Sequence, residues 1–239
     1  MQTQPLGKVF LIPVHLSENN LDCISSEVRN TVYDLDIFIV EKIRSARRYL
    51  RAIGYKKDFD AEVMFLEIEK NQKTNFKPII DKIIKGKSVG VLSEAGCPGI
   101  ADPGTDFVNI AHRHDIEVIP LSGPSSFLMA IMASGLNGQG FCFHGYMPIE
   151  KNEKLKKLQE IQSLAFKTKQ TQVFMETPYR NNALVQDICS SCDSKLSLTI
   201  AKNITDPEMS IKTKTLQEWK KGIPDLHKIP AVFCLNYNL

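Results

Sequence analysis

Ser93-Glu94-Ala95-Gly96-Cys97-Pro98-Gly99-Ile100-Ala101-Asp102-Pro103-Gly104 is the most distinctive segment of the chain, and we call it the central loop. It follows a short apolar run, Val89–Leu92, and precedes a predicted helix, Thr105–Arg113. Glycines and prolines between a strand and a helix predict a tightly bent loop at the carboxyl end of the strand, where open α/β sheets bind ligands. The small side chains leave backbone N–H and C=O groups open to a flat polar ligand.

A second segment repeats this arrangement. Glu117–Leu121 is predicted as a strand, and Ser122-Gly123-Pro124 is predicted to turn the chain. Ser125 is then expected to cap a helix over Ser126–Ala133. We call residues 121–125 the junction loop.

The first predicted strand, Val9–Val14, leads into residues 13–20, which we call the first loop and which contain no glycine. Asn19 or Asn20 is expected to cap the next helix, Leu21–Tyr33. Ile37–Val40 follows as the second strand, and the next helix begins near Glu41-Lys42-Ile43-Arg44.

Strands and helices alternate with short connections through the first half, and this pattern predicts a mainly parallel, wound sheet. In the second half, strands near Leu196–Ala201 and Glu208–Thr213 follow each other without a helix, which predicts a mixed sheet. We therefore expect an α/β protein of two α/β domains, residues 1–121 and 122–239. A length of 239 residues suffices for two modest domains.

Composition and charge are those of an ordinary globular protein. The start of the chain lacks the pattern of a signal peptide, and no apolar run approaches the roughly 20 residues that span a bilayer. We therefore expect no membrane association and a cytoplasmic location. The formal net charge of +3 is too small to indicate a nucleic-acid-binding protein.

The six cysteines are expected to be reduced in the cytoplasm. Cys189 and Cys192 have the spacing of a redox or zinc pair, but no second Cys or His pair accompanies them. We predict no metal site.

Two basic groups each allow two interpretations. Lys151, Lys154, Lys156 and Lys157 form either a phosphate-binding face or the solvated side of a helix. Arg44, Arg47 and Arg48 lie near a strand end, where they either contact phosphates or form salt bridges at a helix start.

Four blocks of the sequence resemble motifs of a known family and follow one another in the family's order. They are Ser93–Gly104, Pro120–Ser125, Phe143–Pro148 and Met175–Arg180. Together they resemble the tetrapyrrole-methylase superfamily of S-adenosylmethionine-dependent methyltransferases, and within it the ribosomal RNA small subunit methyltransferase I branch. The resemblance covers nearly the whole chain. It implies S-adenosylmethionine as cofactor in a cleft between the two domains, and a homodimer.

The resemblance also implies which residues contact the cofactor. Most lie in the central loop and at the domain junction, and two lie at strand ends of the second domain. The implied residues are Pro13, Ser93, Glu94, Ala95, Gly96, Cys97, Ile100, Ser125, Ser126, Met175 and Ala231.

No catalytic residue can be assigned from the sequence. Glu41, Glu94, Asp102, His144 and Glu176 are all candidates for a general base near the implied cleft. His15 in the first loop is either a polar contact or proton acceptor, or an ordinary loop histidine.

Signatures of dinucleotide redox enzymes, P-loop NTPases, zinc hydrolases and serine hydrolases are absent from the sequence. Methyl transfer requires mainly that donor and acceptor be held in line. The nearer resemblance implies 2′-O-methylation of a ribose in small-subunit ribosomal RNA. C-methylation of a tetrapyrrole and non-catalytic binding of S-adenosylmethionine are the alternatives. The glycine-free first loop, and Lys42 and Ile43 in place of the family's acidic and hydroxyl residues, are departures from the family pattern.

Overall fold

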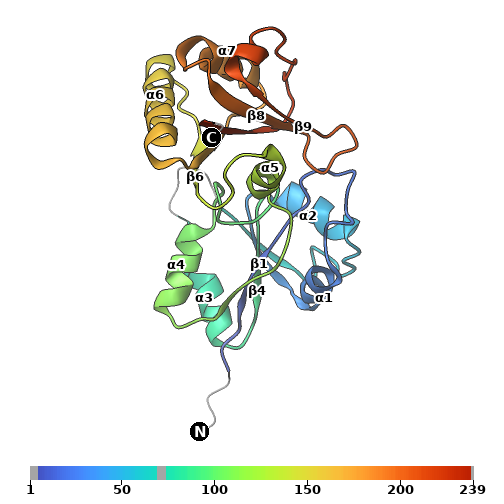
Figure 1. The fold of residues 1–239 in the computed structure, drawn as a ribbon. Coiled ribbons are helices and arrows are strands. Elements are labelled where there is room, and N and C mark those ends of the chain that lie inside the picture. Colours follow the sequence, from blue (N-terminus) through green and yellow to red (C-terminus); the bar gives the residue numbers. More distant parts are fainter. Residues whose placement is uncertain (1–4, 69–73, 238–239) are drawn as a thin grey trace. The chain divides into compact units, whose positions relative to one another are not determined.

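The structure, a computed structural model, describes residues 5–68 and 74–237. The chain divides into two compact units, Met1–Ser125 and Ser126–Leu239, which we call the first unit and the second unit (Figure 1). Among the described residues, none of the helices combines the length and apolar character that crossing a membrane requires.

The sheet of the first unit contains five parallel strands. Their order across the sheet is β3-β2-β4-β1-β5. This confirms the predicted parallel sheet. The strands are β1 (Val9–Ile12), β2 (Ile37–Val40), β3 (Met64–Glu67), β4 (Val89–Leu92) and β5 (Val118–Pro120).

Helices cover both faces of this sheet (Figure 1). Successive residues of a strand point to opposite faces, so Phe38 of β2 packs with the helices of one face and Ile39 with those of the other. Helices α1 (Ser26–Asp34) and α2 (Ile43–Ala52) bury apolar side chains in the first core, and α3 (Lys77–Ile84) and α4 (Thr105–Arg113) in the second.

The connections leave β1 and β4 in opposite directions. From β1 the chain passes through α1 to β2, and from β4 it passes through α4, on the other face, to β5. The neighbouring strands β1 and β4 therefore form the topological switch point, where doubly wound sheets bind ligands beyond the carboxyl ends of the strands. The first loop and the central loop follow these two strands.

Helix α1 begins later than the sequence predicts. Its N-cap is Ser25, whose Oγ accepts a hydrogen bond from the N–H of Val28 at 3.2 Å. The predicted caps Asn19 and Asn20 and the predicted start at Leu21 were therefore wrong. Residues 22–24 form a turn and a bend instead.

The second unit contains a mixed five-stranded sheet of order β6-β7-β10-β8-β9. Only β6 and β7 run parallel, and the other neighbouring pairs are antiparallel. The predicted mixed sheet is confirmed. Its strands are β6 (Phe141–Tyr146), β7 (Thr171–Met175), β8 (Leu196–Lys202), β9 (Ser210–Thr215) and β10 (Ala231–Tyr237).

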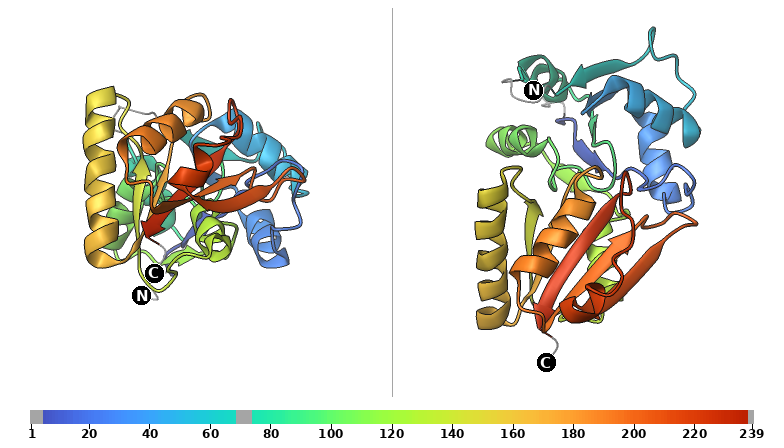
Figure 2. Two further views of the ribbon diagram at one scale, coloured as in Figure 1. Left: turned by 45° about the horizontal axis from the view of Figure 1, so that its top comes forward. Right: turned by 90° about the horizontal axis from the view of Figure 1, so that it is seen from above.

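Different helices pack against the two faces of this sheet. Phe174 of β7 and Phe233 of β10 pack in a core with α6 (Lys151–Thr168), α7 (Asn181–Ser191) and the short α8 (Leu216–Trp219). Phe143 pairs with Val173 on the opposite face, where it stacks on Phe127 of α5 (Ser126–Ser134) with ring centroids 4.8 Å apart. Figure 2 shows α6 and α7 side by side on one flank of the second unit.

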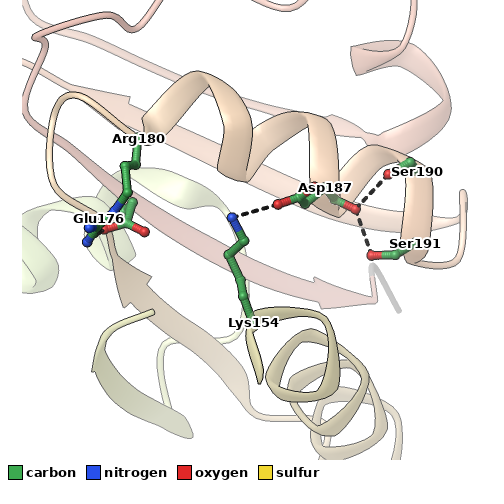
Figure 3. A network of polar contacts seen from close by, with 6 residues as sticks. All are labelled: Lys154, Glu176, Arg180, Asp187, Ser190 and Ser191. Atoms are coloured by element: carbon green, nitrogen blue, oxygen red, sulfur yellow. Dashed lines mark hydrogen bonds and ion pairs between the residues drawn. The ribbon is translucent and has the colours of Figure 1, made fainter. Parts of the chain in front are cut away.

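One lysine of the basic run on α6 is buried. Lys154 points into the second unit, and its Nζ lies 2.7 Å from Asp187 Oδ2 on α7 (Figure 3). The two side chains are only 8% and 19% exposed. The backbone carbonyl of Asp187 also accepts hydrogen bonds from Ser190 and Ser191. Lys154 therefore joins two helices and does not belong to a phosphate-binding face.

We predict that Asp187→Ala destabilises the second unit strongly, because it leaves the Lys154 ammonium buried without its partner. Removing one member of a buried pair costs about 3 kcal/mol or more. The change is measured by denaturant unfolding followed through the fluorescence of Trp219, the only tryptophan of the chain, which is buried in the second unit.

Glu117→Ala is the control, because its ion pair with Lys8 is exposed and should contribute less than about 1 kcal/mol. An Asp187→Ala protein as stable as this control would contradict the structural role of the buried pair.

Candidate functional site

Two loops are joined at the switch point of the first unit. The N–H of Val14 in the first loop donates to Gly96 O at 2.8 Å, and the N–H of Gly96 in the central loop donates to Val14 O at 3.0 Å. Gly96 has φ = 72°, a left-handed conformation that strains residues with a Cβ. The bridge therefore fixes both loops at the ends of β1 and β4.

The junction loop packs against the first loop and the central loop. A Cβ added at Gly123 would lie 2.1 Å from Pro13 Cβ, so only glycine allows this close approach. The thiol of Cys97 donates to Pro124 O at 3.5 Å. Burial raises the pKa of the Cys97 thiol, which keeps it protonated as a hydrogen-bond donor. The structure thus brings the predicted residues Pro13, Gly96 and Cys97 into one cluster of three loops.

The other predicted residues of the central loop differ in exposure. Ser93 is buried, and its hydroxyl donates to Ala95 O at 3.1 Å. Glu94, Ala95 and Ile100 are exposed. The loop therefore holds one side chain inward and presents others, together with its backbone, to solvent.

Ser125 does not cap α5 as the sequence predicts. Its side chain is buried, and Oγ has no hydrogen-bond partner among the described residues. A buried hydroxyl without a partner loses its hydrogen bonds to water without replacing them. This orphan atom belongs to the junction loop, one of the three joined loops, and is suited to a polar group of a ligand.

The remaining predicted residues belong to the second unit. Ser126 is the first residue of α5, Met175 is the last of β7, and Ala231 is the first of β10. Met175 pairs with Val232, the neighbour of Ala231, so Met175 and Ala231 lie at the same end of the sheet. The structure describes their positions, but their contact with a cofactor stays a prediction.

Glu176 follows Met175 and is held by its neighbours. Its Oε1 accepts a hydrogen bond from the N–H of Thr177 at 2.7 Å and another from Arg180 Nη2 at 2.5 Å. Figure 3 shows Glu176 and Arg180 lying against each other. The hydrogen bond to Glu176 raises the pKa of Arg180 further above its usual value, so the guanidinium stays charged. The block Met175–Arg180 thus forms a rigid turn after β7.

The candidate bases Glu94 and His144 both have polar partners. The carboxylate of Glu94 accepts a hydrogen bond from Ser45 Oγ at 3.1 Å and lies 3.8 Å from Lys42 Nζ. His144 Nε2 lies 2.7 Å from Gln172 Oε1. Glu41 and Asp102 also have interactions within the protein. These four candidate bases are therefore not distinguished from one another by their contacts.

A small pocket opens beside the Val14–Gly96 bridge, with a cavity volume of about 50 Å³. This is space for a few water molecules rather than for a nucleoside. The sequence assigned Ser93 and Glu94 to the cofactor site and offered His15 and Arg48 as possible contacts, but it did not single out Glu18 or Ser45. The polar side chains of its wall are His15, Glu18, Ser45, Arg48, Ser93 and Glu94.

One local signal was available for the α2 residues: Ser45 and Arg48 are three positions apart and therefore share a helix face. For Arg47 and Arg48 the structure favours the salt-bridge interpretation, because Arg48 Nη2 lies 2.7 Å from Glu18 and Arg47 Nη2 lies 2.8 Å from Asp60. Arg47 also lies over the rings of Phe59 and Phe65.

Cys189 and Cys192 are buried in the apolar core of the second unit. Across residues 5–68 and 74–237, no group of three or more His, Cys, Asp or Glu side chains is arranged to hold a metal ion.

The wound sheet with three joined loops at its switch point, together with the mixed second sheet, defines a two-unit α/β protein with a candidate ligand site in its first unit. The family model described as Tetrapyrrole (Corrin/Porphyrin) Methylases matches residues 19–220, and the chain belongs to this family. The methyltransferase assignment made from the sequence motifs is thereby confirmed.

Curated relatives are similar over most of the chain. A protein of Buchnera aphidicola subsp. Acyrthosiphon pisum named Ribosomal RNA small subunit methyltransferase I is 30% identical over 219 residues, which cover 90% of this chain and 74% of that protein. A protein of the same name from Halalkalibacterium halodurans is 28% identical, covering 98% of this chain and 76% of its own.

A solved structure shares the fold. The crystal structure of the methyltransferase CobJ aligns with a TM-score of 0.63 over 97% of this chain and 94% of that chain, with 16% sequence identity. At this identity the similarity concerns the fold alone.

We predict that Gly123→Ala lowers stability by about 1–3 kcal/mol, because the new methyl group would overlap Pro13 and force the loops apart. Gly138→Ala is the matched control, since no atom lies within 4 Å of a Cβ at that position. Thermal unfolding followed by circular dichroism compares the two variants. Equal melting temperatures would contradict the close packing of the junction loop on the first loop.

Proposed function

We propose that this methyltransferase uses S-adenosylmethionine to methylate the 2′-hydroxyl of a ribose in small-subunit ribosomal RNA. The observation that carries the proposal is the similarity, over 90% or more of the chain, to relatives named Ribosomal RNA small subunit methyltransferase I. The sequence blocks of the central loop, junction loop and Met175–Arg180 support the same assignment.

The residues of the first unit fit a nucleoside methyl donor. The bridged loops expose backbone polar groups at the switch point, and Ser125 offers a buried hydroxyl that has no partner among the described residues. When bound, S-adenosylmethionine supplies an electrophilic methyl group on a positively charged sulfur. Met175 and Ala231 of the second unit remain predicted contacts, as does the cleft predicted between the two domains.

The task of this chain is then mainly to position the acceptor. Methyl transfer follows an in-line displacement, and fixing two reactants in such a geometry supplies a large share of the rate enhancement. Loops pinned by backbone hydrogen bonds, as at Val14 and Gly96, lose little entropy when the reactants bind. A site built from such loops therefore suits this reaction.

Tetrapyrrole C-methylation is the less favoured alternative. The first loop lacks the glycines of the tetrapyrrole enzymes and carries His15 and Glu18 beside the pocket instead. The sequence block Met175–Arg180 also resembles the RNA-modifying branch. Binding of S-adenosylmethionine without catalysis is the third possibility. We further propose a homodimer acting in the cytoplasm, on the basis of the family resemblance.

We predict transfer of tritium from methyl-labelled S-adenosylmethionine to small ribosomal subunits isolated from a strain that lacks this chain. Because a 2′-O-methylated ribose blocks alkaline cleavage, the label should appear in an alkali-resistant dinucleotide. Subunits from a strain that contains the chain are the control and should accept little label. Label in a base, or transfer only to a tetrapyrrole, would contradict the proposal. Binding without transfer to any acceptor would support the non-catalytic alternative.

The Ser125 hydroxyl provides a test of donor binding that does not depend on activity. Ser125→Ala should weaken binding of S-adenosylhomocysteine by up to about 10-fold, the value of one hydrogen bond. It should leave stability unchanged, because Oγ has no partner to lose among the described residues. Isothermal titration calorimetry measures the affinity.

Ser134→Ala is the matched control. This buried serine donates to Ile131 O at 2.8 Å and accepts from Leu136 N–H at 3.0 Å. Its removal should lower stability by about 1 kcal/mol without changing affinity. If Ser125→Ala instead lost stability and kept full affinity, the assigned role of Ser125 would be wrong.

A further inference from the structure

The first loop places a histidine in a fixed position at the switch point. His15 is half-buried, and its ring meets Tyr49 of α2 edge-on, with centroids 5.5 Å apart and planes at 67°. Tyr49 itself is buried, and its hydroxyl donates to Pro13 O at 2.8 Å. The adjacent Val14 forms the bridge to Gly96. The imidazole is thus held from the helix side and from the strand side.

This histidine faces the pocket that Ser93 and Glu94 also line. Both belong to the central loop, whose contact with the donor is part of the proposed function. The pocket has room for a few water molecules, so a hydroxyl group and its immediate neighbours can enter it, whereas a whole nucleoside cannot. His15 therefore lies where the reacting end of an acceptor would meet the donor-binding loops.

The charged groups around His15 are already paired with one another. On one side, Glu18 and Arg48 form an ion pair with Oε1 and Nη2 2.7 Å apart. Glu18 raises the pKa of His15, whereas Arg48 lowers it. On the other side, Glu94 is bonded to Ser45 and lies near Lys42. Glu18 favours the charged form of His15, but it is paired with Arg48, and burial of the imidazole has the larger effect on the pKa.

Burial lowers the pKa of His15 below the ordinary 6.5. Glu18 and a hydrogen bond with the backbone of His15 partly oppose this decrease, and Arg48 adds to it. The imidazole is accordingly neutral at physiological pH. A neutral imidazole has one ring nitrogen with a free lone pair and can accept a proton. A general base works best when its pKa lies near the working pH, and histidine is the side chain suited to this.

We propose that His15 is the catalytic base that takes the proton of the acceptor hydroxyl. The hydroxyl oxygen forms a bond to the methyl carbon as the bond from that carbon to sulfur breaks. The electron pair of the broken bond remains on sulfur, which gives S-adenosylhomocysteine. The hydroxyl proton passes to the free ring nitrogen of His15, and solvent later removes it. This assignment rests on the proposed function, because C-methylation of a tetrapyrrole presents no ribose hydroxyl.

The test compares His15→Gln and His15→Asn with the wild-type protein. Each variant keeps a polar amide near one of the ring nitrogens but cannot accept a proton. His227→Gln is the matched control, since His227 also lies edge-on to a tyrosine, Tyr179, with centroids 6.0 Å apart, but in the second unit. Melting temperature and calorimetric affinity for S-adenosylhomocysteine are measured first, and both should match the wild type.

Single-turnover methyl transfer to small ribosomal subunits is then measured from about pH 5.5 to about pH 8.5, a range that spans the titration of histidine. The wild-type rate should rise as His15 loses its proton, with a midpoint below 6.5, and then level off. Both His15 variants should be slower by about 100-fold or more, the usual contribution of a general base, and should lack this acid limb. The control variant His227→Gln should keep the wild-type rate and the acid limb of the pH profile.

A His15 variant within about 10-fold of the wild-type rate, or one that keeps the acid limb, overturns the assignment. Failure of the proposed function has a different signature, because the wild-type protein would then bind S-adenosylhomocysteine and transfer no methyl group to the subunits. Titration of His15 by NMR applies in either case. A midpoint above 7 would show that the imidazole is charged at neutral pH and would also overturn the assignment.

Discussion

The backbone bridge between Val14 and Gly96 is the constraint on which the candidate site depends. Two hydrogen bonds tie the loop after β1 to the loop after β4, at the place where the connections of the sheet diverge. The close approach of Gly123 to Pro13 adds the loop after β5. Backbone groups that would otherwise move independently therefore have one fixed arrangement, which preorganises them for a ligand.

The same bridge explains why side chains from distant parts of the sequence meet. It holds Val14 in place, so the neighbouring His15 lies against Tyr49 of α2 and beside Ser93. The glycine-free first loop is thus compatible with the family fold, because the glycine needed for the bridge is Gly96 in the central loop. The first loop places a titratable side chain, His15, in this site while Val14 keeps the bridge to Gly96.

Much of the fold could be predicted because its signals are local. Short apolar runs such as Val89–Leu92 alternate with helices in the first half, and this pattern is sufficient for a parallel sheet. Helix starts were less certain, because several residues can act as a cap. Ser25 caps α1 where Asn19 or Asn20 was expected. Ser125 has the right residue type for a cap, but its hydroxyl forms no bond to α5.

The site could be predicted only in part. The central loop carries its own signal in glycine and proline, whereas the contact of His15 with Tyr49 depends on how α2 packs on the sheet, which no local pattern encodes. Likewise, α6 is amphipathic in sequence, but only its packing on α7 shows that Lys154 is buried. Tertiary contacts between distant segments decide both cases.

Amide hydrogen exchange with and without S-adenosylhomocysteine tests the central claim most directly. If the joined loops form the donor site, bound ligand should slow exchange at residues 93–100 and 121–126 more than elsewhere in the first unit, because it buries backbone N–H groups there. Binding that leaves these segments unchanged and protects a different part of the chain would contradict the account.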